Sequence, residues 1–256
     1  MNDDLILRQT DRGIATVTFN RPDALNALTI EMLTRAGDVL ETLSADQSVS
    51  VVVLTGAGRA FSAGVDLKAL QAAGQDVSEG NVGDALNEAA RRVQHLLETM
   101  PQATIAKVNG FCFTGAVEIM LACDIIIAAE EAKFGDTHAK IGLRPTWGMT
   151  QRLPRRVGMM RARELSFTAR TIDGRQAAEY GLVLEAVPLG ALDEHVADLA
   201  AAIAANSSGS IAAYKDLYAR SENAGLDAGL SYEAETTYAI SDVKQRIGDM
   251  LARLKG

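Results

Sequence analysis

The chain has few cysteines and no long apolar run, and each shortage excludes a class of protein. Its two cysteines, Cys112 and Cys123, lie eleven positions apart in an apolar stretch. This spacing excludes a disulfide framework and a CxxC metal site. No window approaches the roughly 18 apolar residues of a membrane-spanning helix. The first residues, M-N-D-D-L-I-L-R, lack the basic and apolar regions of a secretion signal. We therefore expect a protein of the reducing cytoplasm that has no membrane partner.

Positive charge is also in short supply. The chain has 25 Lys and Arg against 33 Asp and Glu, so its net charge is −8. Proteins that bind nucleic acids or anionic membranes usually carry a net basic surface. We expect neither kind of partner.

The length and the apolar content suffice for one large core. The chain has 256 residues, of which 48% are hydrophobic. Short runs rich in β-branched residues predict strands at residues 14–19, 51–54, 104–108 and 125–129. Helical spacing predicts helices at residues 29–43, 84–100 and 114–123. Strands that alternate with helices favour an α/β fold with parallel pairing.

The second half of the chain has a different pattern. From residue 160 onward it is almost entirely helical, including a long stretch after residue 226. The segment 74–83, rich in glycine, alanine and polar residues, predicts a mobile loop.

A glycine-rich loop follows the predicted strand 51–54. Gly56, Gly58 and Gly64 allow a close approach of the backbone and leave N–H groups free for an anion. A dinucleotide fingerprint would need glycine where Phe61 stands, so that interpretation fails. From the residues alone, a flexible strand-to-helix connection explains this loop as well as a ligand site does.

Glu118 is the one carboxylate in an otherwise uncharged segment. On a helix its neighbours would be Gly115, Leu121, Thr114 and Ala122, none of which is a charge partner. A carboxylate in apolar surroundings has a raised pKa and can act as a base near neutral pH. This pattern favours a functional role over an exposed helix face.

Three segments resemble signatures of the enoyl-CoA hydratase/isomerase (crotonase) superfamily. They are R-A-F-S-A-G-V-D-L-K at 59–68, N-G-F-C-F-T-G-A-V-E at 109–118 and F-G-D-T-H-A-K-I-G at 134–142. The resemblance covers about the whole chain. It implies an α/β fold, a crotonase-like spiral of repeated β-β-α units in residues 1–200, followed by a helical trimerisation region in residues 201–256.

The resemblance also implies which residues hold the substrate. The backbone N–H groups of Val65 and Gly115 would form an oxyanion hole around a thioester carbonyl, and Glu118 would direct a water molecule. Relatives carry a run of glycines around the second of these positions, whereas this chain has T-G-A at 114–116. The residues implied to line coenzyme A are Ala24, Leu25, Ala63, Gly64, Val65, Asp66, Leu67 and Lys68.

The chain departs from the hydratase pattern at His138, where those relatives carry a second glutamate. Imidazole exchanges protons near neutral pH, so His138 is a candidate for the acid that protonates the α-carbon. Asp136 is a second candidate, because in an extended segment residues two apart face the same way. A structural role for His138 remains open. Trp147, the only tryptophan, is expected either to narrow the acyl pocket or to pack in the core.

Taken with the residues, the resemblance implies hydration of a trans-2-enoyl-CoA to a 3-hydroxyacyl-CoA. It implies no metal, no cofactor beyond the coenzyme A of the substrate, and a homotrimer or a dimer of trimers. Three alternatives stay open: a double-bond isomerase, a hydratase-lyase for an aromatic acyl-CoA, and a catalytically idle CoA-binding paralogue.

Overall fold

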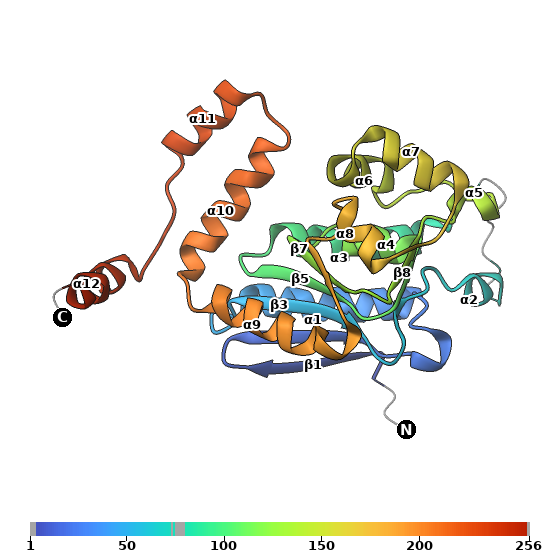
Figure 1. The fold of residues 1–256 in the computed structure, drawn as a ribbon, viewed down its shortest axis with the longest axis horizontal. Coiled ribbons are helices and arrows are strands. Elements are labelled where there is room, and N and C mark those ends of the chain that lie inside the picture. Colours follow the sequence, from blue (N-terminus) through green and yellow to red (C-terminus); the bar gives the residue numbers. More distant parts are fainter. Residues whose placement is uncertain (1–3, 73, 75–79, 255–256) are drawn as a thin grey trace.

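Two sheets and the helices around them form the body of the protein (Figure 1). The structure, a computed structural model, describes residues 4–72, 74 and 80–254. Half of the predicted mobile loop, residues 75–79, lies outside the described residues, as do residues 255–256 of the predicted oligomerisation region.

The larger sheet has six strands in the order β1-β2-β3-β5-β7-β10, which are Ile6–Asp11, Ile14–Phe19, Val51–Gly56, Ala103–Val108, Ile125–Ala129 and Glu185–Val187. All neighbours pair in parallel except β1 and β2. Every residue of β3 is buried, as its continuous apolar sequence predicts for a strand covered on both faces. The four predicted strands and their parallel pairing are confirmed.

A smaller second sheet consists of β4, β6, β8 and β9, which are Ala60–Ser62, Phe111–Phe113, Lys133–Gly135 and Ile172–Asp173. Each of β4, β6 and β8 directly follows a strand of the larger sheet and precedes a helix. The chain therefore passes three times through a β-β-α unit, which confirms the spiral. The prediction missed these strands because three residues are too few to show a period.

Helices α1 (Ile30–Ala45) and α9 (Leu192–Ala204) contact the strands of the larger sheet. Helix α1 begins where the Thr29 hydroxyl accepts the Met32 N–H at 3.2 Å. It packs against α3, Asp84–Thr99. The remaining helices of the body are α2 (Leu67–Ala72), α4 (Gly115–Met120), α5 (His138–Ile141), α6 (Met149–Val157), α7 (Met159–Thr168) and α8 (Gly174–Glu179). Helix α4 is shorter than the predicted 114–123.

The C-terminal helices extend away from the body, in orange and red in Figure 1. They are α10 (Ser208–Ser221), α11 (Leu226–Glu235) and α12 (Val243–Arg253), so the predicted helical stretch after residue 226 is divided in two. Large apolar side chains are exposed on all three: Tyr214, Tyr218, Leu226, Leu230, Val243, Ile247, Met250, Leu251 and Leu254. Within the described residues no single helix is long and apolar enough to span a membrane, although the bent pair Leu189–Ala204 and Ser208–Asn223 passes by length and composition.

Lys215 attaches the C-terminal helices to the body. Its side chain is 9% exposed, and Nζ lies 2.9 Å from Asp124 Oδ2. The same nitrogen donates to the carbonyls of Leu97 and Gln102, at 2.7 and 3.1 Å. An ammonium group with three partners at the edge of the sheet holds α10 in place.

We predict that Lys215→Met lowers the free energy of unfolding by about 1–3 kcal/mol, because two carbonyls and a carboxylate lose their donor. Urea unfolding measures the change, and Lys244→Met on the exposed side of α12 is the matched control. Equal stability of the two variants would show that α10 does not depend on this contact.

Candidate active site

The structure brings the two coenzyme A segments of the sequence prediction side by side. Ala63 N–H donates to the Leu25 carbonyl at 2.9 Å, and Leu28 N–H donates to the Gly64 carbonyl at 2.8 Å. Asp66 N–H then donates to the Leu28 carbonyl at 2.9 Å. Residues 25–28 and 63–66 therefore form a short ribbon, and Ala24 lies next to it in the chain.

Two polar side chains brace this ribbon. Asn26 is fully buried, and its amide donates to the carbonyls of Ala57 and Ala60 while it accepts the Arg21 N–H. The Asp66 carboxylate accepts hydrogen bonds from both terminal nitrogens of Arg21, each at 3.1 Å. It also accepts the Ala69 N–H and so caps the start of α2. Asp66 therefore holds the loop.

The other predicted coenzyme A residues differ in their surroundings. Ala63, Val65 and Leu67 line a cavity described below. Lys68, the second residue of α2, is exposed.

The two predicted oxyanion donors come from adjacent segments. Gly64 has φ +88°, and a Cβ built on it would lie 2.6 Å from the Phe113 carbonyl oxygen and 3.5 Å from the Gly115 nitrogen. Only glycine permits this close approach. Among the described residues, the N–H groups of Val65 and Gly115 donate to no backbone carbonyl or side chain. Two free N–H groups from neighbouring segments suit a developing oxyanion.

Thr114 carries backbone strain next to this pair. Its φ is 52° and its ψ is −112°, a conformation that a β-branched residue rarely adopts and that costs about 1–3 kcal/mol. Its hydroxyl contacts the Thr137 hydroxyl, and its N–H donates to the Gly135 carbonyl at 2.8 Å. These contacts hold the turn that leads into Gly115 and α4.

Glu118 lies at the centre of the site and is 1% exposed. Its Oε1 accepts the backbone N–H groups of Trp147 and Met149, both at 3.0 Å. Met149 opens α6, so the carboxylate sits at the positive end of that helix. Burial raises the pKa of Glu118, and this effect exceeds the lowering by His138 and the two N–H groups.

His138 lies opposite the second oxygen of this carboxylate. Its Nε2 is 3.6 Å from Glu118 Oε2, and its Nδ1 is 2.7 Å from Asp136 Oδ1. Asp136 Oδ2 accepts the Ser166 hydroxyl at 2.6 Å. Burial raises the pKa of Asp136, but the hydrogen bonds from His138 and Ser166 outweigh it and the pKa is lowered overall. An ionised Asp136 accepts the Nδ1 hydrogen and leaves Nε2 directed at Glu118.

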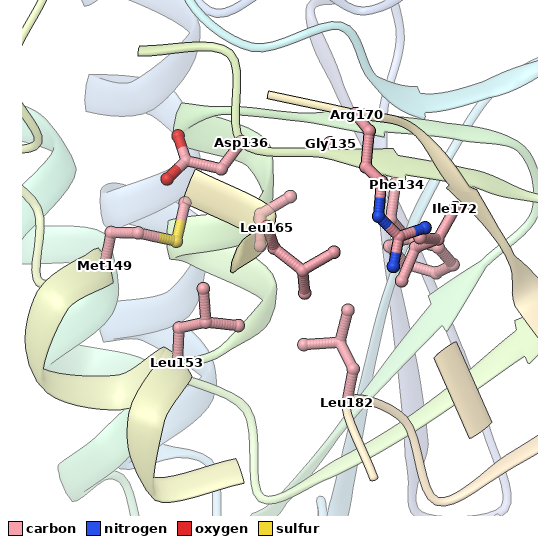
Figure 2. Close-up of a pocket in the computed structure, with 10 residues that line it drawn as sticks. Phe134, Gly135, Asp136, Met149, Leu153, Leu165, Arg170, Ile172 and Leu182 are labelled. Carbon is pink, nitrogen blue, oxygen red and sulfur yellow. The ribbon is translucent and has the colours of Figure 1, made fainter. Parts of the chain in front are cut away.

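The prediction that Asp136 and His138 face the same pocket is wrong. His138 is the first residue of α5, so the segment is not extended there. Asp136 lines a separate cavity of about 20 Å³, where Figure 2 shows it beside Met149 and the apolar side chains of Leu153 and Leu165. Asp136 thus reaches the site only through His138.

A larger cavity lies on the side of Glu118 and His138. Its volume is about 160 Å³. It is lined by Ala63, Val65, Leu67, Val82, Thr114, Glu118, Thr137, His138, Ile141, Leu143, Arg144, Thr146 and Trp147. A carbonyl held at Val65 would therefore lie in the same cavity as the buried carboxylate of Glu118. Within the described residues, no group of three His, Cys, Asp or Glu side chains is arranged to hold a metal ion.

Sequence reasoning missed the polar residues of α3 and α7 that support the site. Gln94, 2% exposed, donates to the carbonyls of Glu118 and Trp147 at 2.9 and 2.6 Å. Asn87 accepts the indole N–H of Trp147 at 2.7 Å, and Ser166 holds Asp136. Two amides on the apolar face of an amphipathic helix are the signal that marks Asn87 and Gln94.

Comparisons with known proteins identify the family and the fold. The sequence profile of the enoyl-CoA hydratase/isomerase family matches residues 9–251. A probable peroxisomal enoyl-CoA hydratase of Arabidopsis thaliana is 34% identical over 91% of this chain and 85% of its own length. The crystal structure of an enoyl-CoA hydratase from Bacillus anthracis superposes with a TM-score of 0.85 at 34% identity, over 91% of this chain and 89% of that one.

A monofunctional enoyl-CoA isomerase from M. smegmatis gives a TM-score of 0.76 at 31% identity, over 88% of this chain and 98% of that one. Hydratases and an isomerase thus share the fold. The chain belongs to the enoyl-CoA hydratase/isomerase family.

Proposed function

We propose that the protein is an enoyl-CoA hydratase, which adds water to a trans-2-enoyl-CoA to form a 3-hydroxyacyl-CoA. The observation that carries this function is the buried carboxylate of Glu118, which lines the same cavity as Val65 and as Thr114, the residue before Gly115. Two relatives named probable enoyl-CoA hydratase, each 34% identical over at least 91% of this chain, support this function.

The two N–H groups would hold the thioester carbonyl oxygen. As the water oxygen bonds to C3, the electron pair of the double bond moves toward the carbonyl oxygen of the thioester and forms an enolate. Donors placed where negative charge develops lower the barrier by about 3 kcal/mol each. The water proton passes to Glu118, whose raised pKa makes it a stronger base than an exposed glutamate.

C2 must then receive a proton, and His138 is the side chain placed to give it. In its acid form Nδ1–H donates to Asp136 and Nε2–H faces the cavity. After the reaction Glu118 holds a proton and His138 lacks one. Glu118 Oε2 and His138 Nε2, which are 3.6 Å apart, would have to approach to hydrogen-bond distance to return the proton to His138 and close the cycle. Asp136 acts as a positioning residue.

The crotonyl-CoA assay tests the proposed function directly. Hydration removes the conjugation of the thioester, so its absorbance falls. Persistence of that absorbance with purified protein would exclude a short-chain hydratase. An isomerase would leave crotonyl-CoA unchanged and instead convert a trans-3-enoyl-CoA to the conjugated 2-enoyl-CoA, with a rise in absorbance.

We also propose that the enzyme is cytoplasmic and that it needs no cofactor beyond the coenzyme A of its substrate. We also propose a homotrimer, singly or in pairs, because the exposed apolar side chains of α10–α12 exceed what a monomer usually leaves in water.

We expect sedimentation equilibrium to give three or six times the 27.2 kDa mass of the chain. The apolar side chains of α11 and α12, which are exposed in one chain, would then be buried between chains. A monomer at micromolar concentration would contradict the proposal.

Glu118→Gln is expected to lower kcat by about 10²–10⁴-fold and to leave the binding of a saturated acyl-CoA unchanged. The amide keeps the hydrogen bonds to Trp147 and Met149 but cannot take a proton. Glu88→Gln, on the exposed face of α3, is the control. Because the pKa of Glu118 is raised, the wild-type rate should fall on the acid side at a higher pH than an exposed glutamate would cause. Retention of a tenth of the activity would remove Glu118 from the role of base.

His138→Ala should lower hydration by about 10²-fold or more, whereas His95→Ala on α3 should not. Asp136→Asn should lower kcat with little change in KM, because an amide that donates to Nδ1 selects the wrong tautomer. A purely structural aspartate would instead change stability and leave kcat of the folded protein intact. Wild-type turnover by His138→Ala would make the histidine structural.

A further inference from the structure

Trp147 is fixed at every polar atom it has. Its indole N–H donates to Asn87 Oδ1 at 2.7 Å, and its backbone N–H donates to Glu118. Its carbonyl accepts from Gln94 at 2.6 Å and from Arg152 at 2.8 Å. Asn87 is itself held, because it also accepts the Thr146 hydroxyl and donates to Asn81. A side chain restrained in this way cannot swing aside for a ligand.

Trp147 lines the cavity, and its ring lies against Gly115. A Cβ built on Gly115 would lie 2.5 Å from Cζ3 of the indole and about as close to two further ring atoms, at 3.1 and 3.2 Å. The indole is 2% exposed and forms part of the wall that also contains Glu118 and Thr146. An acyl chain that extends beyond the reacting carbons on this side would meet the indole.

The room that remains is small. The cavity of about 160 Å³ compares with the roughly 300–1,000 Å³ of pockets for drug-sized ligands. A cavity of about 150 Å³ holds one benzene molecule, or about six carbon-sized atoms. A crotonyl group has four carbons and one oxygen, so with the attacking water it fills about that space. An aromatic ring attached to the three carbons of a 2-enoyl thioester would need room for about six further carbons, as much again as this volume.

We propose that Trp147 is the residue that sets acyl length, and that the site takes short, unbranched 2-enoyl-CoA thioesters and excludes long and aromatic ones. This inference rests on the proposed function, because it concerns the acyl group of that substrate. Trp147 acts as a fixed wall, and Asn87 is the positioning residue that locks the indole.

The variant that tests the wall is Trp147→Ala. It keeps the backbone N–H that Glu118 accepts but removes the ring from Gly115. Hydration of trans-2-butenoyl-CoA and trans-2-octenoyl-CoA is measured as kcat/KM, and the ratio of the two cancels any general loss of activity. Butyryl-CoA and octanoyl-CoA provide dissociation constants that do not depend on turnover.

The wild type should favour the four-carbon substrate by about 10²-fold, since one misplaced methylene costs about 10-fold or more and several must be accommodated. Trp147→Ala should reduce this preference at least about tenfold, because its kcat/KM for the eight-carbon substrate should rise relative to that for the four-carbon substrate. Trp147→Leu should give an intermediate ratio, and it serves if the alanine variant does not fold. Phe167→Ala, an exposed aromatic on α7, should leave the ratio at its wild-type value.

The inference would be overturned, while the proposed function stands, if the wild type had equal kcat/KM for the four-carbon and eight-carbon substrates. It would also be overturned if the ratio of the two kcat/KM values in both Trp147 variants stayed within twofold of the wild-type ratio. Absence of hydration with every substrate would overturn the proposed function. In that case the dissociation constants still decide the inference. Tighter binding of butyryl-CoA than of octanoyl-CoA by the wild type, lost in Trp147→Ala, would support the role of Trp147 in setting acyl length. Equal dissociation constants of the wild type for the two ligands would overturn it.

Discussion

The carboxylate of Glu118 is buried, and the residues around it reduce the free-energy cost of keeping a carboxylate out of water. A buried carboxylate is unfavourable unless hydrogen bonds or opposite charge compensate. Here two backbone N–H groups at the start of α6 hold one oxygen, and His138 faces the other. The compensation is incomplete, because the pKa of Glu118 is still raised. A carboxylate with a raised pKa is a stronger base than an exposed glutamate, which is the property that the proposed role of Glu118 requires.

The spiral explains why such a site can form. The strand β4, the strand β6 and the strand β8 each end at the same side of the smaller sheet, since they run parallel. Val65 follows β4, Gly115 follows β6 and Asp136 follows β8. Three successive turns thereby supply Val65, then Gly115 with Glu118, and finally Asp136, which contacts His138. The strained Thr114 lies where these segments meet.

Much of this arrangement was predictable from the sequence. Continuous apolar runs such as β3 predicted buried parallel strands, and the lone charge at Glu118 predicted a functional carboxylate. What could not be predicted depends on contacts between distant residues. Asp136 and His138 are two apart, yet the start of α5 at His138 turns one toward the cavity and leaves the other behind it. Ser166, Asn87 and Gln94 support the site from helices far along the chain, and no local pattern shows their partners.

The most direct test of this account is the ionisation of Glu118 itself. Carbon-13 NMR of the side-chain carboxyl, assigned by its loss in Glu118→Gln, follows the titration in the folded protein. We expect a midpoint above the ordinary glutamate value of about 4.3, and a midpoint for Asp136 below the ordinary aspartate value of about 3.9. A Glu118 midpoint at or below the ordinary value would show that its hydrogen bonds outweigh its burial, and would contradict its role as a desolvated base.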